Sequence, residues 1–266
     1  MAFKLFARLF AVLLSVSVFT APGVRAAPLL DVMFVLDGSG SVSSSNFHTQ
    51  ITATQGYIST LQNGVPGILR DPGPPVAPDL LGADLNVGIV QFSASANLEL
   101  GLTGNLATVN TALDNMNQLN SHTNHADAFT QAAAELAANG RAGAQQAIVL
   151  ITDGIANEPN AGPIHPFLAA INAAQTAKDD GILIFAIGVG NDIQLFDLEN
   201  YASNPTADFT AHVDNHNALA TLNDDLAEAL LTEETAVSVD APAPLALLGL
   251  GIAGLALMRR RRSASV

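Results

Sequence analysis

Short apolar runs alternate with segments of helical period along the interior of this chain. Most of the runs lack the in-and-out alternation of a half-exposed strand, as expected of strands that are covered on both faces. They lie at residues 32–36, 85–92, 147–151, 182–187 and, more weakly, 209–213. Strands that alternate with helices in this way predict a single α/β domain with a doubly wound, mainly parallel sheet flanked by helices.

The segments between the runs place apolar residues three or four positions apart, which is the spacing of one helix face. One such face holds Phe47, Ile51, Thr54, Ile58 and Leu61, a second holds Leu106, Val109, Leu113 and Met116, and a third holds Leu219, Leu222, Leu226 and Leu230. The serines at 43–45 predict the start of the first helix, and Asn63-Gly64 predicts its end. Asn139-Gly140 and Asp180-Gly181 predict two further helix ends.

One segment has no period at all. Residues 64–84 hold five prolines and four glycines. This composition predicts an exposed loop of about twenty residues, and loops of that length usually serve a function.

The first 26 residues predict a cleaved signal peptide. Lys4 and Arg8 precede an apolar stretch, and Val24-Arg25-Ala26 places small or apolar residues where a signal peptidase reads them. The apolar stretch is shorter than a membrane span requires. We therefore expect the rest of the chain to be exported.

The other end predicts a linker at 232–244 and a hydrophobic sorting or anchor segment at 245–262. Fourteen uncharged residues precede four arginines, which the positive-inside rule keeps in the cytoplasm. At about 1.5 Å per residue the stretch covers about 21 Å of a roughly 30 Å hydrocarbon core, which favours a temporary stop. A transmembrane helix that is retained as an ordinary anchor is the alternative.

This tail resembles the PEP-CTERM sorting signals of Gram-negative bacteria, with Ala243 between two prolines where that family usually has Glu. The resemblance implies that an exosortase-like membrane protease removes the tail. The protein would then be anchored transiently in the inner membrane and end at the cell surface or outside the cell.

Charge and cysteine content exclude several functions. Residues 27–240 contain three basic residues, Arg70, Arg141 and Lys178, against all twenty-four acidic residues of the chain. Such a surface repels phosphate backbones, so nucleic acid is not an expected partner. The chain has no cysteine, which excludes thiol catalysis, Cys-ligated zinc and iron–sulfur clusters.

Polar side chains follow the ends of the predicted strands. Asp37, Ser39 and Ser41 come after the first strand, Asp153 after another, and Thr123 lies in a polar loop before the helix between them. Because ligands bind beyond the carboxyl ends of the strands of such a sheet, these side chains should meet. Their oxygen atoms suit Mg²⁺, with Ca²⁺ or Mn²⁺ as alternatives. In the competing interpretation, Asp37 caps a helix and the serines satisfy backbone amides.

Asp37-Gly-Ser-Gly-Ser41, Thr123 and Thr152-Asp153-Gly154 together resemble the von Willebrand factor A (vWA) domain, over a domain at 27–231. The resemblance implies a Rossmann-like fold and a metal-ion-dependent adhesion site. Ser39 and Ser41 would ligate the ion directly, Thr123 would join in the ligand-competent state, and Asp37 and Asp153 would bind directly or through water. The chain departs from the family pattern around Thr123, with Ser121-His122 before it and His125-Ala126 after it.

An ion held in this way keeps one octahedral position for a carboxylate from a partner protein or glycan. The chemistry favours an exported bacterial surface protein that uses the ion for adhesion or protein–protein interaction. The alternative is a structural envelope or biofilm-matrix protein in which the metal only stabilises the fold.

Enzymatic activity is not expected, because no general base is evident beside the ion and the chain has no Gly-x-Ser-x-Gly elbow. His122, His125, His212 and His216 could hold zinc only with a third ligand. They are interpreted as surface or capping residues.

Overall fold

The computed structural model describes residues 27–65, 80–159 and 164–232. The predicted signal peptide, the C-terminal sorting segment, the linker beyond Thr232 and the centre of the proline-rich loop lie outside these residues. None of the helices in the described ranges has both the length and the hydrophobicity that crossing a bilayer requires.

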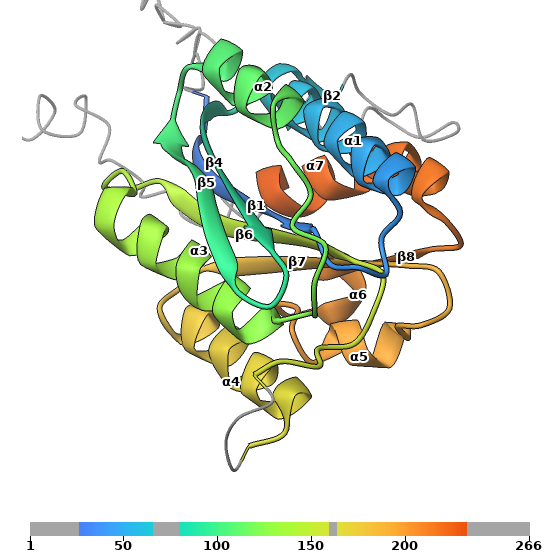
Figure 1. The fold of residues 1–266 in the computed structure, drawn as a ribbon. Coiled ribbons are helices and arrows are strands. Elements are labelled where there is room, and N and C mark those ends of the chain that lie inside the picture. The colour runs from blue at the N-terminus through green and yellow to red at the C-terminus, as the bar shows by residue number, and fades with distance from the viewer. Residues whose placement is uncertain (1–26, 66–79, 160–163, 233–266) are drawn as a thin grey trace, which may run out of the picture.

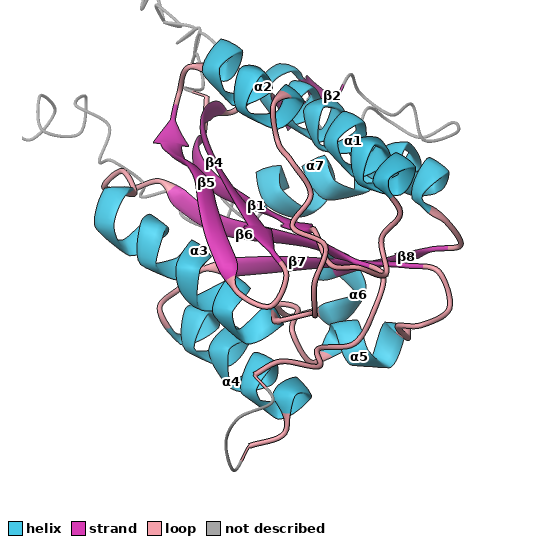
Figure 2. Cartoon of the chain, in the orientation of Figure 1, coloured by secondary structure: helices cyan, strands magenta, loops and turns pink. Residues whose placement is uncertain are grey.

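A single six-stranded sheet forms the centre of the domain, in the order β5-β4-β1-β6-β7-β8 (Figures 1 and 2). Its strands are β1 (Leu29–Asp37), β4 (Asp84–Phe92), β5 (Ala96–Thr103), β6 (Gln145–Thr152), β7 (Leu183–Val189) and β8 (Thr210–Val213). Neighbouring strands are parallel except for β4 and β5. The structure therefore confirms the doubly wound, mainly parallel α/β fold and all five predicted strands. The antiparallel edge strand β5 was not predicted.

Helices cover both faces of the sheet. They are α1 (Ser44–Asn63), α2 (Leu106–Asp114), α3 (His125–Asn139), α4 (Pro166–Asp179), α5 (Leu195–Glu199), α6 (Thr206–Phe209), the 3₁₀ helix η1 (His216–Leu222) and α7 (Asn223–Thr232). Figure 1 shows α1, α2 and α7 on one face and α3 and α4 on the other. The apolar helix faces pack on the strands, and most strand residues are fully buried.

The first helix begins and ends where the sequence predicts. The Ser43 hydroxyl accepts a hydrogen bond from the Asn46 amide at 3.2 Å, which caps α1. After Asn63 the chain turns at Gly64, whose φ of 76° is a conformation that glycine adopts without strain. Because α1 starts beyond the carboxyl end of β1 and runs back along the sheet, this turn lies at the amino-terminal edge, where the Ala83 amide before β4 donates to the Leu61 carbonyl at 2.8 Å.

The prediction of a fully exposed loop at 64–84 was wrong at both of its ends. β2 (Gly64–Val65) and β3 (Leu80–Leu81) pair as a small antiparallel sheet, and Val65 is buried. The helix α7 packs against both strands at the amino-terminal edge. The loop is therefore closed at its base by main-chain hydrogen bonds and by helix packing.

One basic residue stabilises this amino-terminal edge. The Arg141 Nε atom lies 2.7 Å from Oδ1 of Asp31, a fully buried residue on β1, and its Nη1 atom lies 2.9 Å from Oδ1 of Asp84 on β4. A buried carboxylate needs such a partner, because an unpaired charge is costly in a protein interior. The pairing commits Arg141 to the edge opposite the predicted metal site.

Candidate metal centre

Two adjacent strands bring the predicted metal-binding residues together. β1 and β6 are parallel neighbours, and Leu36 lies opposite Ile151 in their register. Asp37 follows Leu36 directly and Asp153 follows Ile151 by two residues, so both acidic residues lie at the carboxyl edge of the sheet. The sequence supplies this geometry because both strands are apolar runs that end in an acidic turn.

Four of the five predicted side chains lie in one hydrogen-bonded cluster. The Ser39 and Ser41 hydroxyl oxygens are 2.9 Å apart, and the Ser41 hydroxyl donates to Oδ1 of Asp153 at 2.6 Å. The Ser39 amide donates to Oδ1 of Asp37 at 2.9 Å. Asp37 and Ser39 are buried whereas Ser41 is exposed, so the cluster opens to solvent on one side. Because Ser43 caps α1, the competing interpretation of Asp37 as the helix cap was wrong.

Burial makes the Asp37 carboxylate costly in the absence of a cation. Desolvation raises the pKa of Asp37 to about 6, although hydrogen bonds from Ser39 and Thr152 act in the opposite direction. Its backbone is fixed by the side-chain amide of Gln50, which accepts from the Asp37 amide and donates to the Asp37 carbonyl, both at 3.2 Å. A divalent cation would favour the charged carboxylate, so this donor set suits a metal ion.

A chain of buried hydrogen bonds supports Asp37 from behind, and sequence reasoning missed it. The Thr152 hydroxyl donates to Oδ2 of Asp37 at 2.7 Å, and Nε2 of His125 lies 3.0 Å from the same hydroxyl. Nδ1 of His125 lies 3.2 Å from the Tyr201 hydroxyl. Burial lowers the pKa of His125 to about 3, so the imidazole is neutral and carries one N–H.

The number of hydrogens that these groups can donate fixes the direction of this series of hydrogen bonds. The Thr152 hydroxyl has one hydrogen and two acceptors, Oδ2 of Asp37 at 2.7 Å and the Gly154 carbonyl at 3.1 Å. Whichever of these takes the hydrogen, the Thr152 oxygen accepts from Nε2–H of His125, and Nδ1 accepts from Tyr201. The interpretation of His125 as a surface or capping residue was therefore wrong. One signal could have revealed it, because His125, Phe129 and Ala132 recur at helical spacing and all are fully buried on α3.

Thr123 is the predicted ligand that stands outside the hydrogen-bonded cluster. Its amide donates to Oδ1 of Asn157 at 2.8 Å, and its carbonyl accepts from the Asn157 amide at 2.9 Å. The loop that carries it contacts the Asp37 turn, since the Gly40 amide donates to the Ser121 carbonyl at 2.7 Å. The backbone of Thr123 is thus fixed between the two loops that hold the cluster.

The zinc interpretation of the histidines gains no support. His212 lies on β8, where Nε2 is 3.2 Å from the Ile193 carbonyl, whereas His216 begins η1, so the two do not share a helix face. Among the described residues, no three His, Asp or Glu side chains gather as a metal site. A metal ion at Asp37 would therefore have two carboxylates beside it and would need hydroxyls and water for its remaining ligands.

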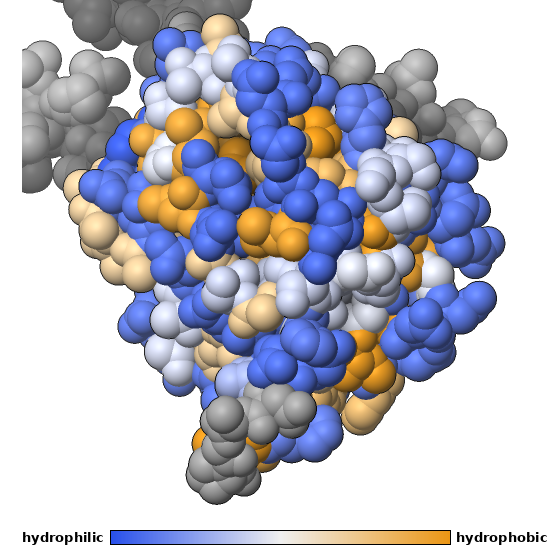
Figure 3. Space-filling view, viewed as in Figure 1, coloured by the Kyte–Doolittle hydropathy of each residue, from blue (hydrophilic) through white to orange (hydrophobic). Residues whose placement is uncertain are grey.

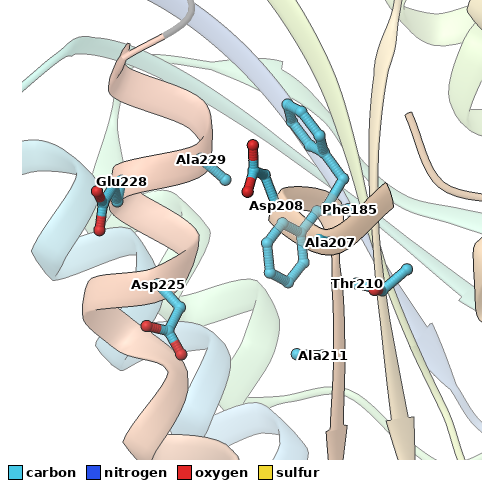
Figure 4. Close-up of a pocket in the computed structure, with 9 residues that line it drawn as sticks. Phe185, Ala207, Asp208, Thr210, Ala211, Asp225, Glu228 and Ala229 are labelled. Carbon is cyan, nitrogen blue, oxygen red and sulfur yellow. The ribbon is translucent and has the colours of Figure 1, made fainter. Parts of the chain in front are cut away.

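A separate pocket of about 440 Å³ lies between β7, α6, β8 and α7. Figure 4 shows Asp208 and Phe185 on one side of it and Asp225 and Glu228 on α7 opposite. Phe185 and Thr210 belong to the amino-terminal halves of their strands, away from the carboxyl edge. The pocket shares no residue with the cluster around Asp37.

Comparison with known proteins decides the family. The model of the von Willebrand factor type A domain matches residues 31–225, which is most of the chain. The chain belongs to this family. The vWA domain is 27% identical to the mouse collagen alpha-5(VI) chain over 203 residues, 74% of this chain and 6% of the collagen. It is 29% identical to mouse matrilin-1 over 189 residues, 67% of this chain and 31% of matrilin-1.

Solved structures share the fold of this vWA domain. Proximal thread matrix protein 1 from the mussel byssus, with a zinc-occupied MIDAS motif, aligns with a TM-score of 0.59 and 19% identity, covering 77% of this chain and 48% of that one. The pilus adhesin SpaC from Lactobacillus rhamnosus GG aligns with a TM-score of 0.57 and 19% identity, covering 79% and 31%. This chain therefore spans less than half the length of each of these four relatives.

The tyrosine at the end of the buried chain provides a test of its role in the vWA domain. A Tyr201→Phe variant should bind Mg²⁺ about tenfold more weakly, as expected for a partner beyond the first ligands. Without the tyrosine hydroxyl, Nδ1 of His125 can take the imidazole hydrogen, and Nε2 then no longer donates to Thr152. Isothermal titration calorimetry measures the affinity.

Tyr57→Phe is the matched control, because Tyr57 is equally buried and its hydroxyl donates to the Leu219 carbonyl at 2.6 Å, away from Asp37. That variant should lose about 1 kcal/mol of unfolding free energy and keep its affinity for Mg²⁺. Equal losses of affinity in the two variants would contradict a series of hydrogen bonds that runs from Tyr201 to Asp37.

Proposed function

We propose that this vWA domain binds a divalent cation at Asp37, Ser39, Ser41, Thr123 and Asp153, and uses it for metal-dependent adhesion or protein–protein interaction. The observation that carries the proposal is the convergence of Ser39, Ser41 and Asp153 beside a buried carboxylate with a raised pKa. Two carboxylates neutralise a divalent ion, and neutral hydroxyls fill further positions without adding charge. The ion then retains affinity for a carboxylate supplied by a partner.

The donor set favours Mg²⁺, with Ca²⁺ or Mn²⁺ as alternatives. Small hydroxyl and carboxylate ligands suit an octahedral ion that keeps several waters. The two ring nitrogens of the neutral His125 are already hydrogen-bonded to Tyr201 and Thr152, so this imidazole is not counted among the ligands. We infer a binding protein rather than an enzyme, since the named relatives are a collagen, a matrilin and a pilus adhesin.

We further propose that the chain is exported by residues 1–26 and reaches the cell surface of a Gram-negative bacterium. Its C-terminal segment would anchor it transiently in the inner membrane until an exosortase-like protease removes the tail. The lysine- and arginine-poor body and the absence of cysteine are compatible with that location.

The second candidate is a structural protein of the envelope or biofilm matrix. The structural similarity to a thread matrix protein of the mussel byssus favours this second role. In that case the ion would stabilise the domain and would not contact a partner.

Binding to native cell envelopes with Mg²⁺ and with EDTA separates these candidates. The exported chain should bind the envelope in Mg²⁺ and be released by EDTA, while its circular dichroism spectrum remains that of a folded α/β domain. Binding that persists unchanged in EDTA would refute the adhesion proposal and favour the structural role.

A further inference from the structure

Two exposed apolar side chains flank the proposed metal site. Leu119 is 36% exposed, and the residues on both sides of it bond to the Asp37 turn: the Gln118 side chain donates to the Ser39 carbonyl at 3.0 Å and the Asn120 amide to the Gly38 carbonyl at 2.8 Å. Ile155 is 42% exposed and follows Asp153 by two residues. Hydrophobic side chains thus border the site from two different loops.

More apolar surface lies at the same edge of the sheet. Leu195 and Phe196 belong to α5, which follows the carboxyl end of β7, and Phe196 is 71% exposed. In the space-filling view, an apolar island at the lower right lies where Figure 1 places α5, with polar atoms around it (Figure 3). An exposed aromatic side chain of this kind is typical of a contact surface.

The charges at this edge restrict the partner further. The two basic side chains of the described residues, Arg141 and Lys178, precede β6 and β7 and so lie at the amino-terminal edge. Asp192 and Asp214 follow β7 and β8 at the carboxyl edge. A run of acidic residues or a sulfated polysaccharide would therefore meet repulsion everywhere except at the ion.

We propose that the partner is a protein segment that presents a single carboxylate between large apolar side chains. Its carboxylate would bind the ion, and its apolar neighbours would pack on Leu119 and Ile155. This inference rests on the proposed function, and it selects a protein partner over a glycan. A polysaccharide supplies carboxylates but offers no aliphatic or aromatic side chains to cover these two residues.

Selection from a phage-displayed library of random peptides tests the inference. The full exported chain is immobilised in Mg²⁺, and bound phage are eluted with EDTA. We expect enriched peptides with one Asp or Glu flanked by Leu, Ile, Phe or Trp. Enrichment of acidic runs, or of peptides without apolar neighbours, would overturn the inference. So would an absence of EDTA-eluted peptides.

Variants of the domain complete the test with the best enriched peptide as the probe. L119S and I155S should each weaken its binding about tenfold, as expected when a large apolar contact is lost. L98S is the matched control, because Leu98 is 38% exposed but lies on β5, paired with Val90 behind the carboxyl edge. It should bind as tightly as the unchanged chain, and equal losses in all three variants would overturn the inference.

The two levels of the proposal fail in different ways. Peptide binding that EDTA does not release would refute the metal-dependent function itself. A different result would be that carboxylated or sulfated polysaccharides are retained in Mg²⁺ and released by EDTA, and that L119S and I155S bind them as tightly as the unchanged chain does. That result would support the metal-dependent function and refute the protein segment as the partner.

Discussion

Replacing Asp153 with alanine should weaken the binding of Mg²⁺ about a thousandfold. Two unit charges about 4 Å apart near a protein surface attract each other by about 4 kcal/mol, and each 1.4 kcal/mol corresponds to a factor of ten. Asp153 also accepts the hydrogen bond of the Ser41 hydroxyl at 2.6 Å, so its loss leaves that proposed ligand with only the Ser39 hydroxyl as a side-chain partner. Calorimetric titration, or competition with Mn²⁺ followed by electron paramagnetic resonance, measures the loss.

The control for this variant is Asp192→Ala. Asp192 is an exposed acidic residue beyond the end of β7, at the same edge of the sheet. Its removal lowers the negative charge by the same amount without touching the cluster, so affinity for Mg²⁺ should change by no more than about twofold at physiological salt. If Asp153→Ala binds Mg²⁺ as the unchanged chain does, the ion lies elsewhere.

Asp37 should make the metal-free domain less stable as the pH rises. The pKa of its buried carboxyl is about 6 in the folded domain, against 3.8 for an aspartate in water. Below about pH 4 both states are protonated, and the full stability is present. Between about pH 4 and pH 6 the unfolded chain releases its proton first, which costs about 3 kcal/mol of unfolding free energy in total and remains lost at higher pH.

Urea denaturation in EDTA between pH 4 and pH 7 measures this effect against Asp37→Asn, which cannot ionise. Relative to that variant, the unchanged chain should lose about 3 kcal/mol across the range. Saturating Mg²⁺ at pH 7 should restore stability to the unchanged chain and not to Asp37→Asn. Parallel stability curves for the two proteins would show that the carboxyl does not titrate as its burial indicates.

Much of the fold and of the candidate site follows from local patterns in the sequence. Asp37, Ser39 and Ser41 occupy alternate positions after a buried strand, and Asp153 follows another strand. Because parallel strands end at one edge, the four side chains must meet there, and in the structure hydrogen bonds connect them. Helix caps such as Ser43 are equally local, since their hydrogen bonds join residues three apart.

The features that sequence analysis missed depend on long-range contacts. Tyr201, His125 and Thr152 are far apart along the chain, so their alignment behind Asp37 is set by packing. The strand β5 alternates apolar with polar or small residues and lies half exposed at the edge, where an apolar run is not needed. Val65 becomes buried because it pairs with Leu80 from the other end of the proline-rich segment.

The position of α7 has a consequence for how the domain would be displayed. This helix ends at Thr232, beside β2 and β3, and β1 begins at Leu29 at the same edge of the sheet. Both points at which the chain leaves the domain are thus at the amino-terminal edge of the sheet, opposite the carboxyl edge that carries Asp153. A nine-residue strand spans about 30 Å. Attachment to a cell through either end would hold the loops that carry Asp37 and Asp153 about one strand length away from the attachment point. These loops would face a neighbouring cell or fibre and not the surface to which the protein is attached.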